Sequence, residues 1–107
     1  MNVESSGTQT AVIGTEHSLA TPSTAKTRVL IVDVNALAAT EVLELRFKAK
    51  VLTGGTERLV LLQSYTGTVS DPITESPPIV MPFGGTITLK QTSGTGRAFD
   101  WSVCTLD

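Results

Sequence analysis

The chain has 107 residues, of which 40% are hydrophobic and 17% are charged. This length corresponds to one domain, and this composition excludes a disordered chain. Eight basic and ten acidic residues leave a formal net charge of -2, so the sequence predicts neither a nucleic-acid partner nor a membrane partner, both of which favour basic surfaces.

The first 27 residues are rich in Ser, Thr, Ala and Gly. They predict an extended N-terminal arm, residues 1–27, with one short strand at Ala11–Ile13 and a loop around Pro22. In an assembly, such an arm can add a strand to a neighbouring chain. Its start lacks the basic and apolar segments of a signal peptide, so we expect synthesis in the cytoplasm.

The segment Arg28–Val34 (RVLIVDV) begins the expected folded domain, residues 28–107. Its nearly continuous run of β-branched residues predicts a central strand that is covered on both faces. Asp33 is the polar exception. We expect its carboxylate to lie at the strand end and to accept hydrogen bonds from turn amides.

The segment Glu41–Tyr65 has the clearest pattern in the chain. Apolar and charged residues alternate from Leu43 to Val51, as in a strand with one packed and one solvated face. Residues 36–52 also favour a helix by propensity, but a helix would spread the alternating apolar side chains around its circumference. We therefore predict a strand, with at most one helical turn before it, and then a turn at Gly54-Gly55.

The return strand, residues 58–65, is apolar on both faces at its start and is predicted to be more buried than its partner. Residues 66–78 contain three prolines and form a turn-rich connection. The short apolar piece 79–83 suits a sheet edge, and residues 86–92 and 97–106 form the last two strands. About seven short strands predict an all-β fold: a single antiparallel β-sandwich or jelly-roll-like barrel.

No catalytic or cofactor motif is visible, so we predict a non-enzymatic protein without cofactor or metal. His17 and Cys104 are the only residues of their types, and their separation matches no usual zinc spacing. We expect His17 to be exposed and Cys104 to be a small, partly buried hydrophobe. Asp71 and Glu75 leave a hydrolase open, because two carboxylates can suffice for hydrolysis. Each glycine pair is followed by a strand, which excludes a phosphate loop.

Two sets of side chains are candidates for contact with a partner. The charged row Glu44, Arg46, Lys48 and Lys50 is expected to be a solvated face, an edge protected by lysines, or a docking surface for an acidic partner. Apolar residues between prolines and glycines, and in the arm, form the second set, because exposed apolar residues mark interfaces. These predicted partner-binding residues are Val12, Ile13, Val80, Met81 and Phe83.

Three stretches resemble small virion proteins of tailed bacteriophages: VLELRFKAKVLTGGTERLVLLQSYTG, ESPPIV and GGTITLKQTSGTGRAFDWSV. The resemblance implies a β-sandwich decoration or cement protein of the capsid. It also implies the major capsid protein as partner, the virion as location, and a homo-oligomer, with a trimer favoured. The alternatives are a head–tail connector component and a carbohydrate- or receptor-binding β-sandwich module.

Overall fold

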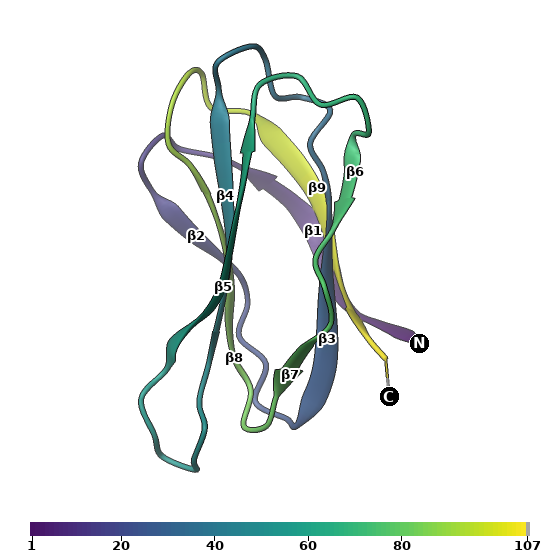
Figure 1. Ribbon diagram of the computed structural model, residues 1–107, viewed down its shortest axis with the longest axis vertical. Helices are drawn as coiled ribbons and strands as arrows, with labels where there is room; N and C mark the ends of the chain where they lie inside the picture. The colour runs from purple at the N-terminus through teal and green to yellow at the C-terminus, as the bar shows by residue number, and fades with distance from the viewer. Residues whose placement is uncertain (107) are drawn as a thin grey trace.

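The computed structural model describes residues 1–106 as an antiparallel β-sandwich of nine strands without helices (Figure 1). The strands are β1 (Asn2–Thr10), β2 (Glu16–Ala20), β3 (Lys26–Asp33), β4 (Val42–Ala49), β5 (Arg58–Thr66), β6 (Ile73–Glu75), β7 (Ile79–Met81), β8 (Gly85–Gln91) and β9 (Ala98–Thr105). The predicted all-β fold class and antiparallel sandwich are confirmed, with more strands than the seven expected.

The strands form two sheets that pack face to face (Figure 1). The first sheet has the order β1-β9-β3-β6, and β7 pairs with the beginning of β3 while β6 pairs with its end. The second sheet has the order β2-β8-β4-β5. β3 is therefore central, as the sequence predicts, and the four edges of the sandwich are β1, the β6–β7 pair, β2 and β5.

The core lies between the sheets and is built by alternation along the strands. In β4, Leu43, Leu45 and Phe47 are at most 2% exposed, while the residues between them reach the surface. The predicted alternation of this strand is thus confirmed up to Ala49. The core from both sheets comprises Leu30, Val32, Val34, Leu43, Leu45, Phe47, Met81, Ile87, Leu89, Phe99 and Val103, with smaller contributions from Ala11, Leu37, Ala49 and Ile79.

The N-terminal segment forms two strands, β1 and β2, so the prediction of one short strand at Ala11–Ile13 is wrong. β1 pairs with β9 in the first sheet, and β2 pairs with β8 in the second. Ala11–Ile13, predicted as the strand, instead connects β1 and β2. The error arises because β1 is polar and mostly exposed on both faces, so its pairing depends on β9, about 90 residues away, and not on a local apolar pattern.

Two predictions about the β4–β5 hairpin are also wrong. β5 is less buried than β4, because β5 lies at the sheet edge and β4 between β5 and β8. Val51 was placed on the packed face by alternation, but β4 ends at Ala49 and Val51 is 81% exposed. By contrast, Asp33 behaves as expected, since its carboxylate accepts a 2.9 Å hydrogen bond from the Asn35 amide.

Glu41 holds together the loops at the end of the sandwich away from the β4–β5 hairpin (Figure 1). Its carboxylate accepts hydrogen bonds from the amides of Ala38 and Thr95 and pairs with the Arg97 guanidinium at 2.9 Å. The helical turn considered before β4 is absent, and the chain instead turns through Thr40, whose φ is 71°.

Hydrogen bonds from Arg97, then from Ala38 and Thr95, lower the pKa of Glu41 to about 2. This pKa predicts a stability loss in acid. A carboxyl group with a depressed folded-state pKa stabilises the fold above its ordinary pKa of 4.5, and that contribution disappears as the pH falls through about 2. We expect Glu41→Gln to lower the melting temperature at pH 7 and to reduce its fall between pH 5 and pH 2. Differential scanning calorimetry across this range measures both effects. Glu75→Gln, at an exposed position of β6, is the control and should match the wild type.

Candidate interaction surface

The β4–β5 hairpin ends in an exposed apolar tip that extends beyond the rest of the sandwich (Figure 1). Val51 and Leu52 at this tip are 81% and 70% exposed. The turn closes with a 2.9 Å hydrogen bond from the Gly55 amide to the Leu52 carbonyl, and Gly54 adopts a φ of 73° that favours glycine. The local sequence therefore fixes a turn that presents both apolar side chains to solvent.

A second apolar lip lies at the same end of the sandwich, in and after β7. Strand alternation turns Ile79 and Met81 inward and Val80 outward. Val80 is 68% exposed and Phe83 is 38% exposed. The chain then passes through Gly84 to β8, where the Gly85 amide donates a 2.9 Å hydrogen bond to the Pro22 carbonyl.

The tip and the lip border one groove of about 550 Å³. Its walls are Lys50, Thr53 and Gly54 of the hairpin, Pro82 and Phe83 of the lip, and Ser23 and Ala25 of the β2–β3 connection. A smaller groove of about 310 Å³ continues beside Val80 and Pro82, and another of about 210 Å³ lies at the tip. We call this region the apolar end surface, defined by Val51, Leu52, Val80 and Phe83 and these three grooves.

The charged side chains that line the three grooves are all positive. Lys26, Lys50 and Arg58 line the three grooves, one in each, and no acidic side chain among the described residues lines any of them. An acidic partner surface that also offers apolar side chains would be complementary to this region.

The structure separates the predicted partner-binding residues into three groups. Val80 and Phe83 are exposed and belong to the apolar end surface. Val12 and Ile13 are exposed by 60% and 39%, but they lie in the β1–β2 connection, toward the other end of the long axis from β7 (Figure 1). Met81 is a correction: it is fully buried, because it faces inward in β7 and packs in the core.

Val51 and Leu52 were missed as candidate site residues. The alternation from Leu43 onward assigns Val51 to the packed face, and this hides the fact that the strand ends earlier. A usable signal is the pair of apolar residues directly before Thr53-Gly54-Gly55, because residues next to a glycine turn project from a hairpin instead of packing under it.

The charged row on β4 forms an ion-pair network on the outer face of the second sheet. Glu16 of β2 lies 2.8 Å from Lys48 and 3.6 Å from Arg46, and Arg46 lies 2.7 Å from Glu44. Hydrogen bonds from Lys48 and then from the Thr88 hydroxyl lower the pKa of Glu16. The row therefore binds its own neighbours in the sheet, whereas Lys50 faces the groove beside the hairpin tip.

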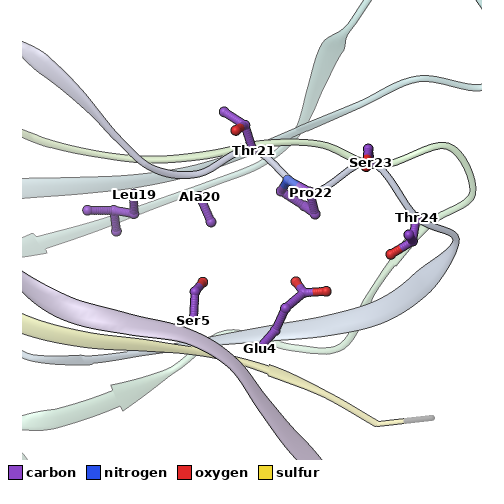
Figure 2. Close-up of a pocket in the computed structure, with 8 residues that line it drawn as sticks. All are labelled: Glu4, Ser5, Leu19, Ala20, Thr21, Pro22, Ser23 and Thr24. Carbon is purple, nitrogen blue, oxygen red and sulfur yellow. The ribbon is translucent and has the colours of Figure 1, made fainter.

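A separate cleft of about 490 Å³ opens between the edges β1 and β2 (Figure 2). Glu4 and Ser5 form one wall, and Leu19, Ala20 and the segment to Thr24 form the other. The Glu4 carboxylate already binds Arg28 through two hydrogen bonds of 2.7 and 2.9 Å. Within the described residues the Ser5 hydroxyl is buried without a hydrogen-bond partner. The Glu4 carboxylate, the charged group of this cleft, is thus already paired within the chain.

The remaining candidates for chemistry do not form one site; they are His17, Cys104, Asp71 and Glu75. His17 is half-buried, not exposed as predicted, because its Nε2 atom accepts a 3.0 Å hydrogen bond from the Val12 amide. Cys104 is a free thiol, 3% exposed, in the first sheet, whereas His17 lies in the second. Asp71 and Glu75 are exposed. Within residues 1–106, no group of three or more His, Cys, Asp or Glu side chains is placed to hold a metal ion.

Comparisons with protein-family models, with curated proteins and with solved structures gave no match. Over the part of the chain that the structure covers, no helix has the length and apolar character needed to cross a bilayer. The apolar end surface is the best-supported candidate site, because its exposed apolar side chains lie beside a groove.

Proposed function

We propose that this protein is a non-enzymatic structural component of a tailed-phage virion, a decoration or cement protein that binds the major capsid protein as a homo-oligomer. The resemblance of three segments to small phage virion proteins supports this role. The observation that carries the proposal in the structure is the apolar end surface, where Val51 and Leu52 project from a hairpin beside a groove.

The shape and charge of this surface suit attachment to a protein lattice. A projecting apolar tip can insert between capsid subunits, and the basic side chains Lys26, Lys50 and Arg58 around the grooves favour an acidic site on the capsid. Four exposed apolar side chains are few compared with the roughly 20–30 residues per side of a standard interface. An oligomer that engages several lattice sites at once compensates for this, since linked sites raise the overall affinity.

Co-sedimentation with empty heads of the phage that encodes this chain tests the proposal. We expect the wild type to sediment with the heads and Leu52→Asp to bind at least tenfold more weakly, because the substitution places a carboxylate on the apolar tip. Raising the salt concentration should also weaken binding, since salt screens the charges around the grooves.

Ile73→Asp is the matched control, because Ile73 is also exposed but lies in β6, outside the apolar end surface. It should bind like the wild type. Equal binding of Leu52→Asp and the wild type would exclude the apolar end surface as the attachment site. Failure of the wild type to bind heads, together with a specific hit on a glycan array, would instead support a carbohydrate-binding module.

A further inference from the structure

β5 is a long, apolar and unpaired edge of the second sheet. It is nine residues long, and only β4 pairs with it. Leu59, Val60 and Leu62 are 55%, 51% and 44% exposed. No hydrogen bond to the outer side of this strand is present in the described residues. An exposed edge of this kind presents free amides and carbonyls to any strand that can pair with it.

The other edges of the sandwich carry features that oppose pairing. β2 has five residues and an irregularity after Ser18, and β1 is polar with a bulge between Val3 and Ser5. β6 and β7 have three residues each and are separated by Pro77 and Pro78. Short strands, bulges and prolines are the usual means of blocking an edge. β5 also has one bulge, at Val60, and like β1 it is long and free of proline. It differs from β1 in its exposed apolar side chains, so it is the long edge best suited to pairing through apolar contacts.

For pairing with a second copy, the charges of β5 favour the antiparallel over the parallel orientation. Arg58 is the one charged residue of β5. Parallel pairing of two copies in register would place both Arg58 side chains together. Antiparallel pairing separates them by eight residues, about 26 Å. The charged rows on the two β4 strands would lie three strand spacings apart, about 14 Å, which exceeds the Debye length of about 8 Å at physiological salt. Repulsion between the copies is therefore small.

We propose that β5 pairs antiparallel with β5 of a second copy, about a two-fold axis at Leu62, and joins two second sheets into one of eight strands. Residues directly opposite each other in antiparallel strands point to the same face. The two Leu62 side chains would therefore meet on the outer face, with Val60 of each copy beside Ser64 of the other. Both side chains of this central pair are apolar, and the contact is identical from either copy, as a two-fold interface requires.

The strength of this association follows from its size. Strand pairing with a few apolar side chains lies at the low end of protein interfaces, and the bulge at Val60 shortens the regular ladder. We therefore expect a dimer with a dissociation constant in the micromolar range, populated at high local concentration. Association needs no other virion component, so it can succeed or fail independently of the proposed function.

Analytical ultracentrifugation from low to several hundred micromolar protein tests the proposal. The wild-type mass should rise toward twice that of the monomer. Leu62→Lys should raise the dissociation constant at least 100-fold, because two lysines would meet at the axis. Ile73→Lys makes a similar apolar-to-lysine change at an exposed position of β6 and should dimerise like the wild type. A strictly monomeric or trimeric wild type would overturn the proposal, as would a dimer that Leu62→Lys leaves intact.

Disulfide trapping gives a second measurement that does not depend on disrupting the edge. Oxidised Leu62→Cys should form a covalent dimer, because the two positions face each other, while Ser64→Cys should not. The native Cys104 is 3% exposed and does not compete. Equal cross-linking of both variants, or of neither, would contradict pairing centred on Leu62. Leu62→Lys keeps the apolar end surface, so it should still bind empty heads, more weakly than the wild type because it loses the linked second site. This separates failure of pairing from failure of the proposed function.

Discussion

Gly84→Ala is expected to destabilise the fold by about 4 kcal/mol or more, a loss that few single substitutions reach. Gly84 lies where the chain turns from β7 into β8, with a φ of 74°. A Cβ atom there would overlap the backbone carbonyl of Pro22 and lie 2.7 Å from the Cα of Ser23. Both obstacles are backbone atoms, so they cannot rotate away as a side chain could. The same Pro22 carbonyl also accepts the hydrogen bond from the Gly85 amide, at the beginning of β8.

Gly54→Ala is a closely matched control for this prediction. Gly54 has a φ of 73°, within one degree of Gly84, but a Cβ atom there would meet nothing within 4 Å. The left-handed backbone alone costs a non-glycine residue about 1–2 kcal/mol. Urea denaturation of both variants separates backbone strain from steric overlap. Similar losses for the two would show that the β2–β3 connection moves aside, and that Gly84 is needed for its backbone angle alone.

Much of the fold can be predicted because its strongest signals are local. The alternation from Leu43 to Ala49 predicts both the strand and its buried face, and Asp33 occupies the strand-end role expected of it. The turn at Gly54 follows from the positive φ that glycine allows. In each case the cause lies within a few residues of the effect, so a single sequence is sufficient to recognise it.

The errors share a physical origin in contacts between distant parts of the chain. β1 is polar, and it is a strand because β9 supplies its hydrogen bonds. β5 resembles a buried strand by composition, but the sheet order places it at an edge. For the candidate interaction surface, the sequence predicts Val80 and Phe83 as members, while the exposure of Leu52 depends on where β4 ends. The burial of Arg28 is likewise not predictable from its neighbours, because its ion-pair partner, Glu4, lies 24 residues away in the sequence.

Glu4→Gln is expected to cost about 3 kcal/mol of folding free energy, because it leaves the buried Arg28 guanidinium without a counter-charge. Arg28 is fully buried. Its Nε and Nη2 atoms donate to the two Glu4 oxygens, and Thr24 accepts two further hydrogen bonds at 2.9 and 3.0 Å. Removing one partner of a buried ion pair costs about 3–5 kcal/mol, and we expect the lower value because the Glu4 side chain is 26% exposed.

A double-substitution cycle tests whether the unpaired charge is the cause. If it is, Glu4→Gln combined with Arg28→Met should be more stable than Glu4→Gln alone, since no buried charge remains. Glu16→Gln makes the same chemical change in the exposed ion-pair network and should cost about 1 kcal/mol or less. A double variant less stable than Glu4→Gln would instead assign the loss to the hydrogen bonds and packing of Arg28.

The pH dependence of these variants supplies an independent check. The hydrogen bonds from Arg28 hold the pKa of Glu4 below its usual value of 4.5. The ion pair therefore stabilises the fold above that value, and this contribution is lost as the pH falls through the lowered pKa. The stability difference between the wild type and Glu4→Gln should accordingly be full at pH 7 and shrink in acid. A difference that is constant with pH would rule out charge pairing as the way in which Glu4 joins β1 to β3.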